Sequence, residues 1–207
     1  MIADAKIVDF AAEYRKETAG DVRADLYSRV LYSTDASLYQ IVPHAVVIPR
    51  TADEVAAAMT LAARYGLPVL ARAAGTSLAG QAVNEAIVID FTRHLDRIVA
   101  IDPEERMAVV QPGVVLDDLN AAARVHGLQF GPDPASSSRS TIGGAVANNA
   151  TGSHSIVYGM TADHVLGMTV VLSDGSTARL GPGTNDGSPA ARRIAAEITA
   201  LVTPEAN

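Results

Sequence analysis

The spacing of apolar residues divides the first half of the chain into helices and short buried strands. Apolar residues recur at helical spacing over residues 4–17, which predicts an amphipathic helix. The β-branched run at 45–48 is typical of a strand, and the next helix is expected to begin at a capping box formed by Thr51 and Glu54. Two further buried strands are expected, at residues 68–70 and 86–89. The order strand, helix, strand, loop, strand favours a βαβ-type layer with parallel strands.

The second half of the chain has a different pattern, which predicts mainly antiparallel strands. Strand-like runs at 97–101 and 106–110 flank an acidic turn, and runs at 165–173 and 176–180 flank Asp174-Gly175, a two-residue hairpin signal. Helices are expected over residues 115–126, after residue 141 and over 189–202. The whole pattern predicts an α+β fold with a small parallel-type βαβ lobe and a larger, mainly antiparallel lobe. A cofactor usually lies in a cleft between two such lobes.

The same pattern suggests how the chain is organised. We expect a helical lead-in over residues 1–44, a first lobe over 45–105, a second lobe over 106–183, and a linker with the start of a helix over 184–207. We also expect the natural protein to continue beyond residue 207, because the helix expected over 189–202 is unfinished.

Composition excludes several classes of function. The 207 residues carry 16 basic and 23 acidic side chains, a net charge of −7, and no basic stripe, which disfavours nucleic-acid binding. The absence of cysteine excludes disulfides, iron–sulfur ligation and a cysteinyl flavin link within this chain. No apolar run approaches the roughly 18 residues of a membrane span, and the acidic start of the chain does not fit a signal peptide. These features predict a cytoplasmic protein, with attachment to a membrane periphery through partners left open.

The loop over residues 71–81, ARAAGTSLAGQ, follows a predicted strand and combines small residues with hydroxyls. A diphosphate needs several main-chain N–H groups directed at one place with little side-chain bulk, and the Ala-Ala-Gly-Thr-Ser sequence at 73–77 meets that need. The loop is neither a G-x-G-x-x-G motif nor a P-loop, and Ala79 breaks the G-x-S-x-G pattern. The alternative is a plain turn after a strand.

A second glycine-bearing segment, SSSRSTIGGAVANNATG, spans residues 136–152. Ser140 or Thr141 is expected to cap a helix whose first turn includes Gly143 and Gly144, where unpaired N–H groups and the helix dipole favour an anion. Each of these glycines costs about 1 kcal/mol relative to alanine, and the alternative reason for them is close helix packing. We expect this segment and the one around Gly75 to face one crevice and to bind a diphosphate jointly through main-chain amides.

The sequence predicts no catalytic constellation and no metal site. The five histidines are scattered without metal-ligand spacing, and Asp133 and Asp163 have no obvious partner carboxylate. Tyr158 is expected either to face a flavin or to be a half-buried core residue.

Taken in order, the two segments resemble the FAD-binding domain of the vanillyl-alcohol-oxidase-like (PCMH-type) flavoproteins. Matching positions include Arg72, Gly75, Thr76 and Ser77 in the first segment, and the run from Thr141 to Gly144 in the second. The flanking stretches YSTDASLY (32–39), VVIPRTADEV (46–55), VVQPGVVLDDLN (109–120) and VYGMTADHVLGMTVVLSDG (157–175) are also similar to this family. Within it, the chain is most similar to the N-terminal part of FAD-linked D-2-hydroxy-acid dehydrogenases and glycolate oxidase flavin subunits.

The resemblance implies FAD bound between the two lobes. The first loop would hold the diphosphate, the second segment would line the diphosphate, ribityl and flavin side, and Pro112 and Val165 would contact the nucleotide end. The implied cofactor contacts are Arg72, Ala73, Ala74, Gly75, Thr76, Ser77, Gln81, Pro112, Pro134, Ser138, Thr141, Gly143, Gly144, Asn148, Gly152, Ser155, Tyr158 and Val165. The chain departs from the family where Ala73 and Ala74 replace glycines and Ala145 replaces asparagine, which implies less room and a weaker affinity. Because no histidine stands at the covalent attachment position, FAD is expected to be non-covalent.

The resemblance also implies a reaction, the oxidation of a D-2-hydroxy acid such as D-lactate, glycolate or D-2-hydroxyglutarate by hydride transfer to flavin N5. The proton-accepting base, the carboxylate-binding arginines and any iron–sulfur cluster would belong to a region after residue 207, so this chain alone is expected to bind FAD without turnover. Two alternatives stay open at this point: a nucleotide-binding or partner-docking module without redox activity, and an NADPH-dependent reductase of the same fold. The electron acceptor and the oligomeric state are not predicted.

Overall fold

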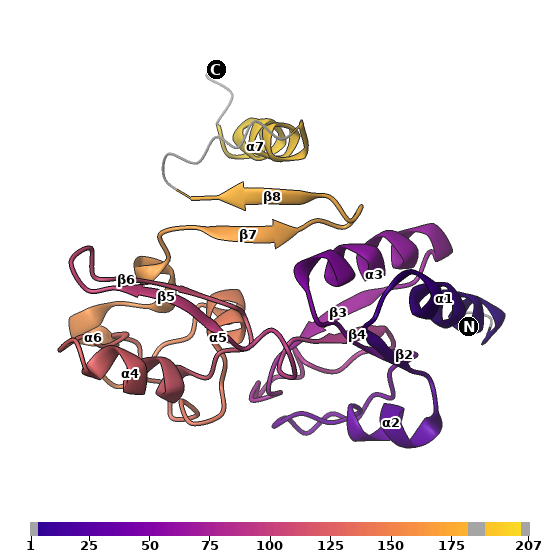
Figure 1. Cartoon of the computed structure of the whole chain (residues 1–207), viewed down its shortest axis with the longest axis horizontal. Helices are drawn as coiled ribbons and strands as arrows, with labels where there is room; N and C mark the ends of the chain where they lie inside the picture. The colour runs from indigo at the N-terminus through magenta and orange to yellow at the C-terminus, as the bar shows by residue number, and fades with distance from the viewer. Residues whose placement is uncertain (1–3, 182–188, 204–207) are drawn as a thin grey trace.

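The computed structural model describes residues 4–181 and 189–203. Figure 1 shows two lobes side by side, with the hairpin over residues 168–180 and the helix over residues 189–202 layered above them. The first lobe is built on a four-stranded sheet with the strand order β1-β2-β4-β3. Its strands are β1 (Asp21–Arg23), β2 (Ala45–Ile48), β3 (Val69–Arg72) and β4 (Ile87–Asp90). Strands β2, β4 and β3 are parallel, which confirms the predicted layer. Strand β1 pairs antiparallel with β2 at the edge of the sheet, and three residues of Asp-Val-Arg were too short a pattern to predict it.

Helices cover both faces of this sheet, which explains why its central strands are apolar along their length. All four residues of β2 and of β4 are buried, as expected for parallel strands covered on both sides. The helices are α1 (Asp4–Glu17), α2 (Leu26–Leu31) and α3 (Ala52–Tyr65). One face packs in the main core with Phe10, Tyr14 and Leu61 of α1 and α3, and the other face carries Val46, Ile48 and Val88.

The predicted start of α3 is confirmed in one half only. Thr51 accepts a hydrogen bond from the Glu54 amide (3.3 Å), but the Glu54 carboxylate accepts from the Arg50 amide (2.5 Å) and the Ala19 amide (3.1 Å). Glu54 therefore also anchors the turn between α1 and β1. The helix ends at Gly66 in the left-handed conformation, as the sequence indicated.

The second lobe contains two separate two-stranded antiparallel sheets and short helices. Its strands are β5 (Ile98–Asp102), β6 (Met107–Val110), β7 (Met168–Val171) and β8 (Thr177–Leu180). Its helices are α4 (Leu116–Arg124), α5 (Ile142–Asn148), α6 (Ser155–Tyr158) and the 3₁₀ helix η1 (Thr161–His164). The antiparallel character is as expected, whereas α6 and η1 were not predicted.

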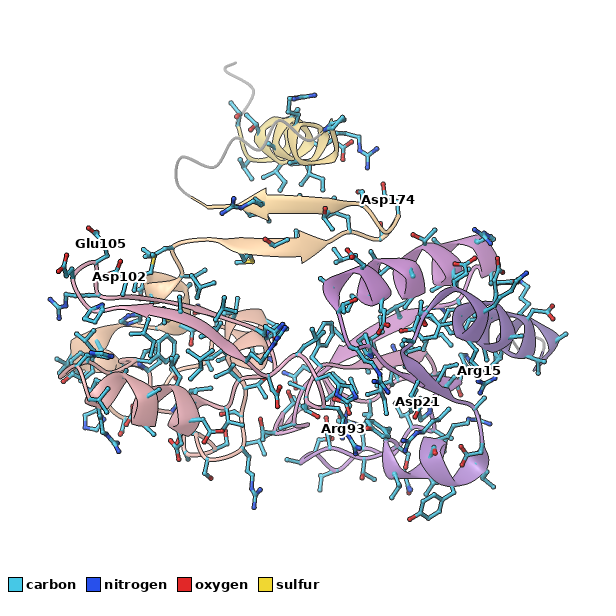
Figure 2. The ribbon with its side chains drawn as sticks, in the orientation of Figure 1. Arg15, Asp21, Arg93, Asp102, Glu105 and Asp174 are labelled. Carbon is cyan, nitrogen blue, oxygen red and sulfur yellow. The ribbon has the colours of Figure 1, made fainter. Side chains whose placement is uncertain are left out.

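The hairpin β5–β6 spans the boundary that the sequence predicted between the two lobes. Its two strands pair from Ile98 with Val110 to Asp102 with Met107, and Asp102 and Glu105 lie at its tip (Figure 2). A boundary between residues 105 and 106 would cut through this tip, so we propose that the second lobe begins before β5.

The hairpin β7–β8 turns through three residues instead of the predicted two. The Leu172 amide donates to the Ser176 carbonyl (2.8 Å), the Gly175 amide donates to the Leu172 carbonyl (2.9 Å), and Gly175 has a φ of +83°. This is the three-residue loop in which a left-handed glycine follows a type I turn. The turn, marked by Asp174 in Figure 2, lies against α3, because a Cβ on Gly175 would be 1.9 Å from Thr60 Oγ1.

Helix α7 (Pro189–Val202) lies over β8 and agrees with the helix expected at 189–202 (Figure 1). The linker expected before it lies at 184–188, outside the described residues. Within 4–181 and 189–203, no helix is long and apolar enough to cross a membrane.

Candidate cofactor site

The loop after β3 presents main-chain amides without acceptors. From Ala73 to Leu78, none of the N–H groups donates to a described acceptor, and the hydroxyls of Thr76 and Ser77 are likewise unpaired in the part of the chain that the structure describes. Gly75 has a φ of +70°, a left-handed turn that changes the direction of the chain within the loop. A short run of such amides is what an anion needs. The loop therefore fits the phosphate-binding role predicted from its composition.

The side chain of Arg72 is turned away from this role. Its guanidinium donates to the carbonyls of Ala82 (2.8 Å), Thr34 (2.8 Å) and Tyr32 (3.3 Å), and it lies 5.4 Å from the centre of the Tyr32 ring. Burial lowers the pKa of Arg72 from its ordinary value, although Asp35 opposes the effect. Arg72 thus ties both ends of the loop to the N-terminal segment, and its contact with a cofactor stays a prediction.

Residues 32–39 complete the support of the loop. The Ala36 amide donates to the Gly75 carbonyl (2.9 Å), and Asp35 accepts from the Ala82 amide (3.2 Å) and the Ser37 amide (2.8 Å). Burial acts to raise the pKa of Asp35, but the hydrogen bonds from Ser37 and Ala82 and the charge of Arg72 leave it below its ordinary value. The Gly75 carbonyl of the loop therefore has a hydrogen-bond partner, while the amides from Ala73 to Leu78 have none among the described residues.

Below the loop, the Tyr32 hydroxyl donates to the buried Asp90 (2.5 Å). Asp90 also accepts from the amide and the hydroxyl of Thr92, each at 2.7 Å. Burial, followed by the contact with Asp90, raises the pKa of Tyr32 to about 12. Hydrogen bonds among Tyr32, Asp90 and Thr92 therefore join the N-terminal segment to the end of β4.

The start of α5 differs from the prediction in how its amides are used. Thr141 is buried and caps the helix, accepting from the Gly144 amide (3.3 Å), as expected. The Ile142 and Gly143 amides, however, donate to the carbonyls of Val114 and Pro112, both at 2.8 Å. The expectation of unpaired amides at this helix start is wrong, because the segment before α4 lies alongside it and accepts their hydrogen bonds.

Different neighbours explain why α5 has glycine at positions 143 and 144. A Cβ on Gly143 would be 2.6 Å from the Pro112 Cβ, so this glycine permits close packing, the alternative that the sequence had left open. A Cβ on Gly144 would be 3.3 Å from the Ala73 Cβ. The two predicted segments therefore meet at Ala73 and Gly144, although they are about seventy residues apart in the sequence.

A crevice of about 290 Å³ runs along this meeting point. Three predicted residues, Ala74, Ser138 and Thr141, line it. Sequence reasoning had not chosen its other lining residues, which are Thr92, Asp96, Gly113, Val115, Asp118 and Arg139. A second, more apolar crevice of about 250 Å³ is lined by Val146 of α5 and Val165, together with Met168 and Leu180. Val165 thus lines the second crevice, and Pro112 lies beside the start of α5, where its carbonyl accepts from the Gly143 amide.

The remaining predicted residues make local contacts. Gln81 accepts from the Ala79 amide (3.3 Å), the Pro134 carbonyl accepts from the Ser137 amide (2.9 Å), and the Asn148 side chain donates to the Gly144 carbonyl (3.1 Å). Ser155 accepts from the Gly152 amide (2.9 Å), and the partly exposed Tyr158 lies beside His154.

The prediction missed one hydrogen-bonded pair of side chains altogether. His154 Nδ1 lies 2.5 Å from Asp133 Oδ2, joining two loops twenty-one residues apart. No spacing rule links these residues, and only the position of His154 just after the glycine-bearing segment was a signal. Among the described residues, no group of three or more histidine, aspartate and glutamate side chains could hold a metal ion.

Two α+β lobes with a free-amide loop packed against a glycine-containing helix define a dinucleotide-binding domain. The sequence model described as "FAD binding domain" matches residues 43–181. The chain therefore belongs to the FAD-binding domain family, and the resemblance inferred from its two loops is confirmed.

The chain is 40% identical over 173 residues to the D-2-hydroxyglutarate dehydrogenase of Escherichia coli, covering 82% of this chain and 17% of that protein. It is 39% identical over 155 residues to the glycolate oxidase subunit GlcD of Bacillus subtilis, covering 74% of this chain and 33% of that one. Among solved structures, p-cresol methylhydroxylase shares the fold, with a TM-score of 0.75 and 21% identity over 89% of this chain and 38% of that chain. The chain thus spans a third or less of the length of these two curated relatives.

Proposed function

We propose that this chain is the FAD-binding part of a dehydrogenase that oxidises a D-2-hydroxy acid of the 2-hydroxyglutarate, glycolate or lactate type. The observation that carries the proposal is the run of amides without acceptors from Ala73 to Leu78, in a loop that meets α5 at Ala73 and Gly144. The chain that carries this loop belongs to the FAD-binding domain family. The names of the relatives support the class of substrate, while their greater length means that the reaction belongs to the whole protein.

The residues present fit FAD. The amides of the first loop and the hydroxyls of Thr76 and Ser77 would bind the diphosphate, replacing its water by fixed donors. Gly144 would let the cofactor pass close to α5, and the apolar crevice at Val165 would take the adenine end. We infer a non-covalent complex, because the first loop has no side chain suited to a flavin bond.

When bound, FAD supplies the hydride-accepting chemistry, and this chain supplies binding and orientation. A base for the substrate hydroxyl and groups for the substrate carboxylate are expected in the rest of the protein, as is any iron–sulfur cluster. We infer a cytoplasmic location, with any membrane association made through partners.

A titration of the purified chain tests the binding role. FAD should bind with quenched fluorescence and bind more tightly than ADP, because the flavin half adds contacts. Equal affinity for FAD and ADP would favour a nucleotide-binding module without redox activity. Absence of FAD binding would contradict the proposal.

Rapid-mixing reduction of the FAD-loaded full-length protein tests the reaction. D-2-hydroxyglutarate, glycolate and D-lactate are compared with NADPH, and at least one hydroxy acid should bleach the flavin. Reduction by NADPH alone would identify a reductase of the same fold instead.

A further inference from the structure

The hairpin β7–β8 extends from the second lobe to helix α3 of the first lobe (Figure 1). Its strands pair with each other, from Met168 with Leu180 to Val171 with Thr177, and form a sheet of their own among the described strands. A two-stranded sheet is only marginally stable by itself. The contacts at the two ends of the hairpin, together with α7 over β8, therefore decide where it lies.

The root of the hairpin forms part of the second crevice. Four residues of the root line this crevice together with Val146 of α5, and they are Gly167, Met168, Leu180 and Gly181. The backbones are close here, because a Cβ on Gly181 would be 2.8 Å from the Gly167 Cα. The root is therefore packed into the part of the second lobe that α5 also forms.

The tip of the hairpin rests on the first lobe. The Asp174 carbonyl accepts a hydrogen bond from the Thr60 hydroxyl at 3.5 Å. A Cβ on Gly175 would be 1.9 Å from the same hydroxyl oxygen and 2.9 Å from the Ala56 carbonyl oxygen. Thr60 and Ala56 belong to α3, so position 175 has no room for a side chain while the tip lies on this helix. We call this approach of residues 174 and 175 to α3 the tip contact.

Helix α3 connects the tip contact to the first loop. Strand β3 follows α3 in the chain and leads directly into the loop at Ala73. The inner face of α3 packs in the main core through Ala58, Leu61 and Ala62. Because a close-packed core transmits displacement, α3 and the strand that carries the loop keep a fixed relation.

The two lobes thus meet at the first loop and again at the tip contact. At the first loop, a Cβ on Gly144 of α5 would be 3.3 Å from the Ala73 Cβ. Lobes joined by a small interface move relative to each other by default. A second contact, away from the first, limits their rotation about it.

We propose that Thr60 and Gly175 are positioning residues for FAD, because the tip contact fixes the spacing between the first loop and the second crevice. The inference rests on the proposed function, in which FAD extends from that loop to that crevice. A ligand that spans two lobes binds more tightly when their spacing is set in advance, since less binding energy is spent on ordering them. Neither Thr60 nor Gly175 lines a crevice described above, so losing the tip contact should weaken FAD binding without removing a crevice-lining residue.

Gly175→Ala in the purified chain tests the tip contact, because the added methyl group displaces the tip from α3. FAD affinity should fall about tenfold, a coupling of the size usual between separate sites. Gly127→Ala is the matched control, since Gly127 has a φ of +69° against +83° for Gly175, and no atom lies within 4 Å of a Cβ there. The control should bind FAD as the wild type does. Urea unfolding of both variants separates a loss of fold from a loss of affinity.

A reversible link between the same two positions tests the spacing directly. The chain has no cysteine, so Thr60→Cys combined with Gly175→Cys introduces one possible intramolecular disulfide. The Cβ of Thr60 lies 3.1 Å from a Cβ built on Gly175, and a small separation brings the pair to the roughly 3.5–4.5 Å of a disulfide. The oxidised form should bind FAD as the wild type does, because the tip is held on α3. The reduced form should bind about tenfold more weakly, because the side chain at position 175 displaces the tip.

The wild type is titrated with and without the reductant as a control, and its FAD affinity should not change. If the wild-type chain takes up no FAD, the proposed function fails and this inference fails with it. If FAD binds but the oxidised and reduced forms of the double variant have equal affinity, the tip contact does not position FAD and this inference alone is overturned. Failure of the disulfide to form would also overturn it, because the tip would not then rest on α3.

Discussion

Substitution of Gly75 by alanine tests how the phosphate loop is held. Gly75 has a φ of +70°, and a Cβ there would be 2.6 Å from Arg72 Nη2, the atom that donates to the Thr34 carbonyl. Alanine in the left-handed conformation costs about 1–2 kcal/mol. Displacing the guanidinium loses at least one hydrogen bond from a charged group, about 1.5–3 kcal/mol. The expected loss in free energy of unfolding is therefore about 2.5–5 kcal/mol.

The chain contains a matched control at Gly127. Its φ of +69° is nearly the same, but no atom lies within 4 Å of a Cβ at that position. Gly127→Ala should therefore carry only the conformational cost of about 1–2 kcal/mol. The difference between the two variants isolates the displacement of Arg72.

Urea unfolding measures both free energies, and FAD titration measures the consequence for the site. Gly75→Ala should weaken FAD binding about tenfold or more, a change of 1.4 kcal/mol for each factor of ten, while Gly127→Ala should leave it unchanged. Equal destabilisation by the two substitutions, or an unaltered FAD affinity for Gly75→Ala, would refute the argument that Arg72 holds this loop.

Three further substitutions test the supports around the site. Tyr32→Phe should cost about 1–3 kcal/mol by leaving Oδ2 of the buried Asp90 without its donor, while Thr92 continues to donate to Oδ1. Because the pKa of Tyr32 is raised to about 12, the free energy of unfolding of the wild type should fall as the pH rises from about 10 to 12. The Tyr32→Phe variant should not show this fall when its unfolding is measured over the same pH range. The pKa of Asp35 is lowered, so its contribution to the free energy of unfolding should be present above about pH 4 and lost as the pH falls below that value. Asp35→Asn should therefore reduce the loss of stability in acid, and an unchanged loss would contradict this. Thr51→Ala should cost about 1 kcal/mol in thermal or urea unfolding by removing the cap on the Glu54 amide, and a fully stable variant would show that the cap contributes nothing.

Local patterns were sufficient for most of the elements in the chain. The helix starting at Thr51 and ending at Gly66, the buried strands β2 and β4, and the cap at Thr141 all follow from contacts within a few residues. The free amides of the phosphate loop also follow locally, since small residues and a left-handed glycine keep the chain out of regular structure. For these features the amino-acid sequence by itself determined the outcome.

Contacts between distant segments decided how the site is used. Arg72 turns toward the carbonyls of Tyr32, Thr34 and Ala82, although it belongs to the phosphate-loop motif, because partial burial makes those acceptors the available partners. The first amides of α5 are consumed by Val114 and Pro112, which only the packing of that segment could reveal.

The pairing of Asp133 with His154 and the pairing of the edge strand β1 could not be predicted for the same reason. Each depends on two parts of the chain meeting in space, and hydrophobic periodicity describes only which face of an element is buried. The sequence alone thus determined the secondary structure and the chemistry of the loops. The tertiary structure decided that the Arg72 side chain and the first amides of α5 form hydrogen bonds within the fold, because hydrogen bonds are satisfied by whichever partner the fold brings within reach.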